Sequence, residues 1–413
     1  MFKNFKGDLL GGITAGIVAL PLALAFGVQS GLGASAGLYG AIFIGFFAAL
    51  LGGTSTQISG PTAPMTAVSL LAVAKIVSEH NGNVSEALPF ILFVFFAAGV
   101  FQIIFGVIRL GSLIKHIPST VVSGFMSGIG FIILITQLPN LFGHKAGGVL
   151  GAVKAIPNAI AHINITELSL AMLTILIIYG FKRITKVIPS TLVALLVIST
   201  GSVFLLESGS YGIIGEIPEG FPKPNIAMFT LFSFRAFSPY ILTAFSLALL
   251  GTIDSLLTSV VADNMTDTKH NSNKELIGQG IGNSIASIFG GIPGAGATIR
   301  TVVNIDAGGK TKLSGMVAGV LLLVILMVLG PLASLIPNAV LAGVLVTVGL
   351  GVMDVKSLKT MHKQSLSDVV VMLLVLTLTV FWDLIFAVAI GVLVHYAVNT
   401  VKVLSFKKSY KVN

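Results

Sequence analysis

Two breaks rich in proline and glycine interrupt the apolar pattern of this chain, at residues 59–64 and 290–296. Each break is followed by a helical run that is too short to cross a bilayer. A helix that begins inside a bilayer leaves its first N–H groups unpaired and carries a partial positive charge at that end. An anion is the natural partner of such a helix end. Paired, interrupted segments in two halves of a chain therefore predict a binding site for a small anion.

Hydroxyl side chains next to the breaks could add hydrogen-bond donors to this site. They belong to Thr62, Thr66 and Thr298. If both helices begin near the midplane of the bilayer, their N-termini face each other and form one pocket. The alternative is that the glycine and proline residues only kink two helices, which membrane proteins tolerate. Two kinks at equivalent positions favour the pocket.

A carboxylate, that of Asp254, lies deep inside another apolar segment. A charge in such a place is costly and therefore indicates a functional residue. Thr258 follows one turn later, so its hydroxyl shares a helix face with Asp254. With carbonyl groups freed at the second break by Gly296, they would make the all-oxygen site that a hard cation such as sodium prefers. Two alternatives remain: a carboxyl that carries a proton, or a structural ion pair with Arg300.

Two further side chains could contribute to the anion pocket. Arg300 stands one helical turn after the second break, where it could supply a fixed positive charge or extend its head group towards the cytoplasm. Phe26 follows Pro21 near the middle of the first apolar segment and could line the pocket. An aromatic side chain at such a place is more often simple packing.

The composition predicts an all-α polytopic membrane protein. Of the 413 residues, 55% are apolar and 9% are charged, and the mean hydropathy is +1.00. A soluble domain carries about 25% charged residues, so this chain has too little polar surface to face water on all sides. The absence of cysteine excludes disulfides and thiol catalysis, and no nucleophile and base stand at a usable spacing. We therefore expect neither an enzyme nor a covalent cofactor.

Fourteen membrane segments are expected, and the third and tenth are short. Their ranges are 9–28, 36–52, 64–78, 87–108, 117–138, 165–181, 187–206, 237–262, 274–290, 296–305, 312–330, 337–353, 366–382 and 384–403. With the N-terminus inside, most of the 24 basic residues fall on the cytoplasmic side. Both termini are therefore predicted to be cytoplasmic. The net charge of +9 then reflects orientation in the bilayer rather than a nucleic-acid partner.

A short pattern recurs in the two halves of the chain. Residues 117–124 read IPSTVVSG and residues 336–343 read IPNAVLAG, at the starts of predicted segments five and twelve. Seven segments separate the copies, and because seven is odd the second copy must run the opposite way through the bilayer. Residues 188–191 share part of the pattern, so proline in the first turn of a helix is the alternative explanation. The equivalent positions of the two breaks favour a 7+7 inverted repeat.

This repeat predicts the organisation of the chain. The first repeat comprises residues 1–206 and the second comprises residues 237–405. Between them, residues 207–236 contain several glycine and proline residues and are expected to form an external linker.

Five blocks of sequence resemble the SulP family, the sulfate-permease-related anion transporters. The blocks are GDLLGGITAG at 7–16, LPLALAFG at 20–27, ISGPTAP at 58–64, IDSLLTSVVAD at 253–263 and NKELIGQGIGN at 273–283. The resemblance covers essentially the whole chain, and the five blocks occur in the order expected of the family.

The resemblance implies a division into two domains. A core domain would comprise residues 9–108 and 237–330, and a gate domain would comprise residues 117–206 and 337–405. In this family the core carries the anion by sliding against the gate, an elevator-type mechanism, usually in a homodimer. Family members usually carry a STAS domain after the last segment. This chain stops at Asn413, so we expect no STAS domain in it.

Within the family, the pattern of Asp254 and Thr258 with residues 296–298 resembles the sodium-dependent bicarbonate transporters of cyanobacteria. By this resemblance sodium is held by Asp254, Thr258, Gly296 and Thr298. Bicarbonate is contacted by Thr62, Ala297 and Thr298. Arg300 departs from this pattern, because the bicarbonate transporters have a small residue there, whereas many sulfate, dicarboxylate and exchange-type members have an arginine.

We therefore predict a sodium-coupled importer of a small inorganic anion, bicarbonate first, in the bacterial cytoplasmic (inner) membrane. Sodium at Asp254 would neutralise the carboxylate, so sodium and the anion would bind cooperatively. The main alternative is proton-coupled uptake of sulfate or a dicarboxylate, with Arg300 binding the second charge. An anion exchanger, a channel and a nucleobase carrier are further alternatives.

Overall fold

The computed structural model describes residues 4–111, 118–146, 148–185, 188–207, 209–215, 217–218, 220–231, 233–382 and 384–409. Residue 117, where the gate domain and the first copy of the repeated pattern are predicted to begin, lies outside these ranges. Residues 208, 216, 219 and 232 of the predicted linker lie outside them as well. Within the described ranges, the regular structure is helical apart from two strands of two residues each.

A helix lies at each of the fourteen segments that the sequence predicts. These helices are α1 (Phe5–Gln29), α2 (Ala34–Leu51), α3 (Ala63–Glu79), α4 (Val84–Val107), α5 (Ser119–Leu141), α7 (Ile165–Ile184), α8 (Ser190–Leu205), α11 (Ile241–Thr266), α12 (Ser272–Ile288), α13 (Thr298–Asp306), α14 (Lys312–Ala333), α15 (Asn338–Val352), α17 (Leu366–Phe381) and α18 (Leu384–Ser409). Shorter pieces join them: α6 (Gly148–Ala161), α9 (Ala227–Thr230), α10 (Phe234–Phe237), η3 (Ser238–Tyr240), α16 (Val355–Lys359) and η4 (Met361–Lys363).

Several of these helices suit a bilayer by length and composition. Among the described residues, seven helices are long and apolar enough to cross a membrane. Their bounds are Phe5–Gln29, Ala34–Leu51, Val84–Val107, Ser119–Leu141, Ile165–Ile184, Ser238–Thr266 and Lys312–Ala333. The chain is therefore an all-helical membrane protein with several long apolar helices, as its composition predicts.

The chain forms two compact units. Unit 1 comprises Met1–Ile114 and Thr136–Thr347, and unit 2 comprises Lys115–Ile135 and Val348–Asn413. All the residues that the sequence singles out for ion binding belong to unit 1.

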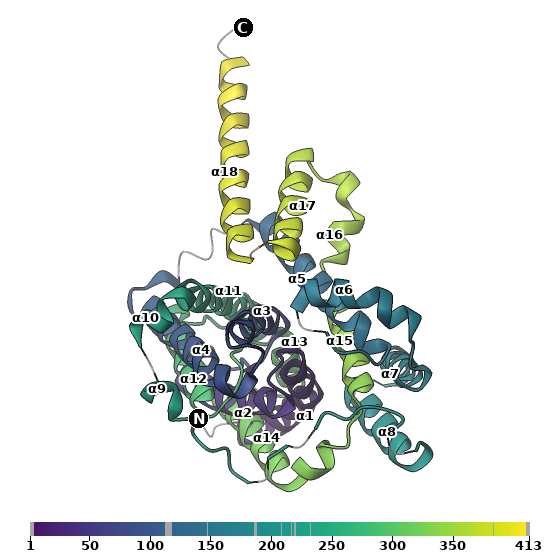
Figure 1. Ribbon diagram of the computed structural model, residues 1–413. Helices are drawn as coiled ribbons and strands as arrows, with labels where there is room; N and C mark the ends of the chain where they lie inside the picture. The colour runs from purple at the N-terminus through teal and green to yellow at the C-terminus, as the bar shows by residue number, and fades with distance from the viewer. Residues whose placement is uncertain are drawn as a thin grey trace. The chain divides into compact units, whose positions relative to one another are not determined.

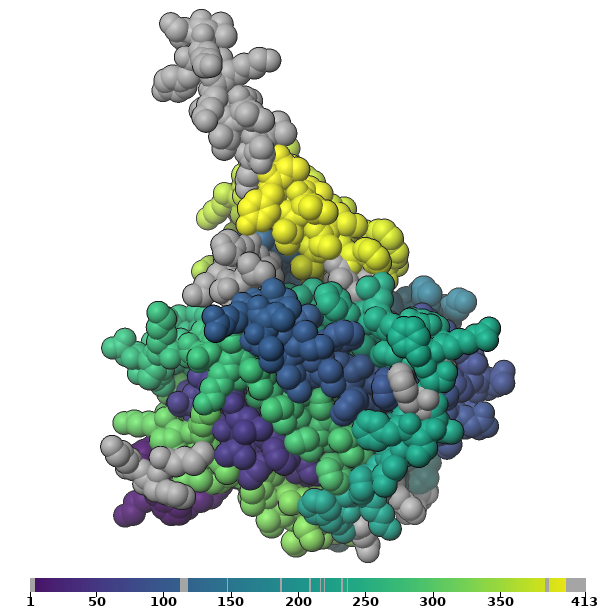
Figure 2. Space-filling view, turned by 90° about the vertical axis from the view of Figure 1, so that its left-hand side faces the viewer, coloured from purple at the N-terminus to yellow at the C-terminus, as the bar shows by residue number. Residues whose placement is uncertain are grey.

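Helices of unit 1 pack closely because small residues lie at their crossings. In Figure 1, α12 is flanked by α4 and α2, and α2 also contacts α1 and α14. Where α4 crosses α12, a Cβ on Gly99 would lie 2.6 Å from the carbonyl oxygen of Gly280, and a Cβ on Gly280 would lie 2.5 Å from that of Gly99. The two backbones are therefore in contact, as glycine permits in membrane helices. On the other side of α4, its blue surface adjoins the green surface of α11 (Figure 2).

Candidate ion-binding site

The two breaks meet as a short antiparallel ladder. Strand β1 (Ser59–Gly60) pairs with β2 (Ala295–Gly296), with Ser59 opposite Gly296 and Gly60 opposite Ala295. The ladder continues on one side, because the N–H of Ala297 donates to the carbonyl of Ile58 over 2.8 Å. Segments that are far apart in the sequence are thus joined backbone to backbone at the point where both are interrupted.

Glycine makes this close pairing possible. A Cβ on Gly294 would lie 2.1 Å from the carbonyl oxygen of Gly60 and 2.6 Å from the nitrogen of Pro61. Neither neighbour is the end of a flexible side chain, so neither could move aside. Gly60 has φ +155°, a conformation that side chains disfavour. The glycines of both breaks therefore let two backbones approach, in addition to interrupting helices.

Each strand leads directly into a helix. Thr62 precedes the first residue of α3 and Ala297 precedes the first residue of α13, and neither side chain caps its helix. The N–H groups of the first turns point back towards the ladder, and with them the positive ends of two helix dipoles. The helix ends are thus placed as an anion site requires.

Thr62 joins this ladder region to α11. Its hydroxyl donates to Oδ2 of Asp254 over 2.7 Å. Asp254 as a whole residue is partly exposed, and Thr62 holds one oxygen of its carboxylate. A residue predicted for the anion and one predicted for the cation are therefore in direct contact.

The other three residues predicted for sodium form one cluster of oxygen atoms. The hydroxyl of Thr258 donates to the carbonyl of Gly296 over 2.9 Å, and lies 2.7 Å from the hydroxyl of Thr298. Ser255 also holds Gly296, because its hydroxyl accepts a hydrogen bond from the N–H of Gly296 over 3.1 Å. Asp254 stands one turn before Thr258 on α11, so it shares the helix face that carries the cluster.

Arg300 is buried beside the first break. It is 2% exposed, and its Nη2 donates to the carbonyl of Pro61 over 2.7 Å. Its Nε and Nη1 have no hydrogen-bond partner within the described ranges. Among the described residues, no ion pair joins Arg300 to a carboxylate, which argues against the structural pair with Asp254. Its burial also argues against a head group extended towards solvent.

Phe26 and Thr66 are buried without a polar contact that would define their roles. Phe26 is 3% exposed. The hydroxyl of Thr66 is buried and finds no hydrogen-bond partner in the part of the chain that the structure describes, although the N–H of Thr66 continues the first turn of α3. Their contribution to anion binding stays a prediction.

A buried carboxylate that the sequence did not point out lies behind β1. Glu275 of α12 is 1% exposed and accepts hydrogen bonds from the segment between α2 and β1. Ser255 was missed as well. The signal for Glu275 was available, since it falls in the block at 273–283, but its chemistry could not be assigned without knowing what faces it.

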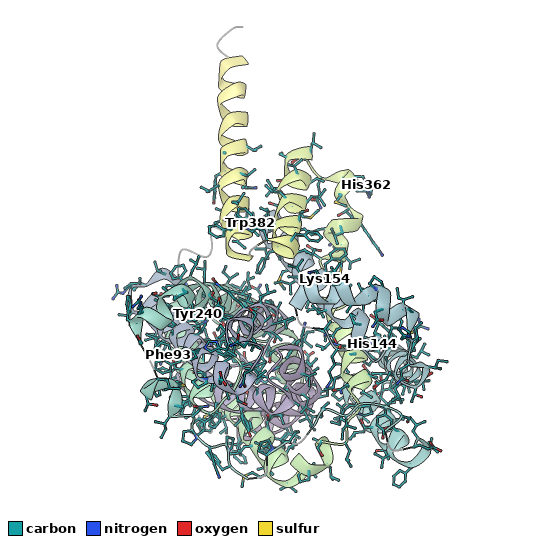
Figure 3. The ribbon with its side chains drawn as sticks, viewed as in Figure 1. Phe93, His144, Lys154, Tyr240, His362 and Trp382 are labelled. Atoms are coloured by element: carbon teal, nitrogen blue, oxygen red, sulfur yellow. The ribbon has the colours of Figure 1, made fainter. Side chains whose placement is uncertain are left out.

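An apolar pocket elsewhere in unit 1 does not suit an inorganic anion. Its lining comes from α4, η3 and the segment before α11 and comprises Pro89, Phe90, Phe93, Met228, Leu231, Ser233, Phe237 and Tyr240. Figure 3 labels Phe93 and Tyr240 close to each other at the left of the view. No residue predicted for ion binding lines it, and none of its lining residues carries a full charge at neutral pH.

Comparisons with known proteins show what this chain is similar to. A sequence profile described as the sulfate permease family matches residues 5–375. The bicarbonate transporter BicA of Picosynechococcus sp. is 47% identical over 416 residues, which covers 100% of this chain and 73% of the relative. Sulfate transporter 4.1 of Arabidopsis thaliana, a chloroplast protein, is 27% identical and covers 94% of this chain and 57% of the relative.

A solved structure shares the fold. The transmembrane domain of a cyanobacterial bicarbonate transporter BicA superposes with a TM-score of 0.88 at 46% sequence identity, covering 94% of this chain and 98% of that one. The match extends over nearly the whole transmembrane domain, so the fold of this chain is that of a multi-pass integral membrane protein.

Proposed function

The chain belongs to the sulfate permease family, a family of anion transporters rather than enzymes, and we propose that it imports bicarbonate together with sodium. The observation that carries this proposal is the ladder between β1 and β2. It brings two helix N-termini, which favour an anion, next to an oxygen cluster that suits a cation.

The cation part of the site would consist of Asp254, Thr258, Gly296 and Thr298. One carboxylate, two hydroxyls and one carbonyl supply only oxygen, which hard cations prefer. A single carboxylate also matches a single positive charge. The contacts of Thr258 with Gly296 and Thr298 support this assignment, because they hold three of the four oxygen donors together.

The anion part would lie at the start of α3 and α13. Thr62, Ala297 and Thr298 border it, and Thr66 and Phe26 would line it. Arg300 adds a fixed positive charge with two unpartnered nitrogens, and such donors suit a planar oxyanion.

Sodium and bicarbonate would assist each other's binding. Without a cation, the charge of Asp254 would repel an anion beside Thr62, whose hydroxyl lies 2.7 Å from Oδ2 of Asp254. Sodium at Asp254 cancels this repulsion, so the affinity for the anion rises, and by reciprocity the anion raises the affinity for sodium. The sodium gradient can then drive uptake of the anion.

We further propose that the site moves across the membrane in an elevator-type cycle. The core domain, residues 9–108 and 237–330, would carry both ions past the gate domain, residues 117–206 and 337–405. Fourteen segments in a 7+7 inverted repeat, with half-helices at α3 and α13, would build the two domains. The chain would act as a homodimer in a bacterial cytoplasmic membrane with both termini inside.

Uptake of labelled bicarbonate into proteoliposomes tests this proposal. We expect an inward sodium gradient to drive uptake, and choline in place of sodium to abolish it. Asp254→Asn should lower the apparent sodium affinity by about tenfold or more, because it removes the charge that faces the cation. Asp306→Asn, at an exposed carboxyl on α13, is the matched control and should behave like the parent protein. Sodium-independent uptake would rule out the coupling.

A second candidate substrate is sulfate or a dicarboxylate, coupled to protons. The buried charge of Arg300 favours it, because an arginine can bind a second negative charge. Competition in the same vesicles separates the two proposals. Sulfate that inhibits better than bicarbonate, with uptake driven by a pH gradient in the absence of sodium, would favour this alternative.

A further inference from the structure

We propose that Glu275 is a positioning residue for the sodium site. Its carboxylate holds Gly296 in place through two separate series of contacts, one through Gln57 and one through Gln279 and Ser59. This inference rests on the proposed function, because it concerns the residue whose carbonyl would bind sodium. Glu275 itself lies on α12 and is not one of the proposed ligands.

The carboxylate of Glu275 is fully engaged inside the protein. Oε2 accepts from the N–H groups of Gly53 and Thr54, each over 2.8 Å. Oε1 accepts from Nε2 of Gln57 over 2.8 Å and from Nε2 of Gln279 over 2.9 Å. A buried carboxylate is costly unless hydrogen bonds compensate it. Four donors on two oxygens compensate this one, and all four come from neutral groups.

A positively charged side chain, that of Lys312, binds a neighbouring part of the backbone. Lys312 donates to the carbonyls of Leu50 and Gly52 at the end of α2. Among the described residues, no ion pair joins its ammonium group to Glu275. The carboxylate therefore remains free to organise residues 53–57, the segment that leads from α2 to the site.

The first chain of contacts runs through Gln57. Its Nε2 donates to Glu275, and its Oε1 accepts from the hydroxyl of Ser259 over 2.9 Å. The amide group so held lies directly against Gly296, because a Cβ on Gly296 would be 2.4 Å from Nε2 of Gln57. Gln57 thus supports the backbone of Gly296 from behind, while Thr258 binds its carbonyl.

The second chain runs through Gln279. Its Nε2 donates both to Glu275 and, over 2.5 Å, to the hydroxyl of Ser59. Ser59 is the ladder partner of Gly296. The carboxylate of Glu275 therefore restrains Gly296 in two ways. Gln57, which it binds, packs against Gly296, and Gln279, which it also binds, holds Ser59, the backbone partner of Gly296. Loosening the carboxylate should loosen the carbonyl that sodium requires.

The test is Glu275→Gln, measured by sodium titration of bicarbonate uptake. The glutamine keeps the shape but replaces one acceptor oxygen with a donor, so two of the four donors lose their partner. We expect the half-saturating sodium concentration to rise by about tenfold, while the maximal rate at saturating sodium changes by less than about twofold. A merely structural role would lower the amount of folded protein and the maximal rate and leave the sodium dependence unchanged; that result would overturn the inference.

Matched variants keep the inference testable. Glu207→Gln changes an exposed glutamate in the linker and should leave the sodium dependence unchanged. Gln57→Met removes only one of the two chains at similar volume and should shift the half-saturating concentration in the same direction by a smaller factor. If Glu275→Gln does not fold, Gln57→Met decides the matter, and an unshifted sodium dependence in that variant contradicts the inference.

The two proposals fail in different ways. If uptake by the parent protein is independent of sodium, the proposed function is wrong. If the parent protein depends on sodium and folded Glu275→Gln has the same sodium dependence, only the positioning role is wrong.

Discussion

Thr62 donates a hydrogen bond to Asp254 over 2.7 Å, and this contact joins the start of α3 to the middle of α11. Thr62 stands at the break that we assign to the anion. Asp254 is the only proposed sodium ligand that carries a charge. The contact therefore links the two halves of the proposed site, and it offers a way to measure their coupling.

Thr62→Val should weaken this coupling. Valine has the shape of threonine without the hydroxyl, so Oδ2 of Asp254 loses its donor and its negative charge is no longer offset beside the anion part of the site. We expect the apparent affinity for bicarbonate to fall by about tenfold. A double-mutant cycle with Asp254→Asn, read as apparent affinity, should show that the two effects are not additive. Thr230→Val, at an exposed position, is the control, and additive effects of Thr62 and Asp254 would contradict the coupling.

Gly294→Ala should separate the two breaks. The added methyl group would lie 2.1 Å from the carbonyl oxygen of Gly60, so the ladder cannot keep its geometry. We expect transport to be lost even in protein that still inserts and elutes as a single species. Gly201→Ala is the matched control, because a Cβ there meets nothing within 4 Å. In the interior of α8 it should preserve transport and stabilise the helix by up to about 1 kcal/mol.

Arg300→Met should leave the thermal stability unchanged or raise it, and should weaken anion binding. The buried guanidinium has two nitrogens without a partner among the described residues, and a buried charge that is not paired is costly to fold. We therefore expect a thermal unfolding midpoint in detergent that is unchanged or higher, together with at least a tenfold loss of anion affinity, equivalent to about 1.4 kcal/mol. A variant that unfolds at lower temperature but transports normally would assign Arg300 a structural role only.

The carboxyl of Asp354 predicts how the local stability of α16 depends on pH, at a place outside the membrane segments. Partial burial alone would raise the pKa of its carboxyl, but hydrogen bonds from Ser357 and Ser123 and the charge of Lys356 hold the pKa below its ordinary value. Its Oδ1 caps α16 by accepting from the N–H of Ser357 over 3.0 Å. A lowered pKa means that this stabilisation is complete above the unfolded-state pKa of about 3.9 and is lost only as the pH falls through the folded-state value.

Hydrogen exchange of α16 checks this prediction. Lowering the pH from 7 to 5 should leave the intrinsic-rate-corrected protection of α16 unchanged. Asp354→Ala at pH 7 should remove about 1 kcal/mol of local stability, and so speed exchange by about fivefold. The amides of α17 serve as the internal reference. Loss of protection between pH 7 and 5 would contradict the lowered pKa.

The sequence predicts the helices well because membrane insertion depends on local composition. Each expected segment contains a helix, and even the nine-residue α13 was expected between 296 and 305. The short α13 could be recognised because proline and glycine interrupt the apolar pattern before it. Five sequence blocks predict the family, and the pattern of Asp254 and Thr258 with residues 296–298 predicts the likeness to bicarbonate transporters. Both predictions are confirmed by the comparisons.

Side-chain partners were harder to predict, because they depend on which helices face each other. The sequence allows an ion pair between Arg300 and Asp254, but in the structure Arg300 donates to the carbonyl of Pro61. The chemistry of Glu275 could not be read from the sequence, since three of its four donors come from residues 53–57, which are far from it in the chain. The roles of Phe26 and Thr66 and the division into core and gate stay predictions.

The central claim is that sodium and bicarbonate bind next to each other and assist each other. Isothermal titration calorimetry of the purified protein measures this directly, as the dissociation constant of sodium with and without saturating bicarbonate, at constant ionic strength with choline. The account predicts that bicarbonate tightens sodium binding by about tenfold, and that sodium tightens bicarbonate binding by the same factor. A sodium affinity that is unchanged by bicarbonate would contradict it.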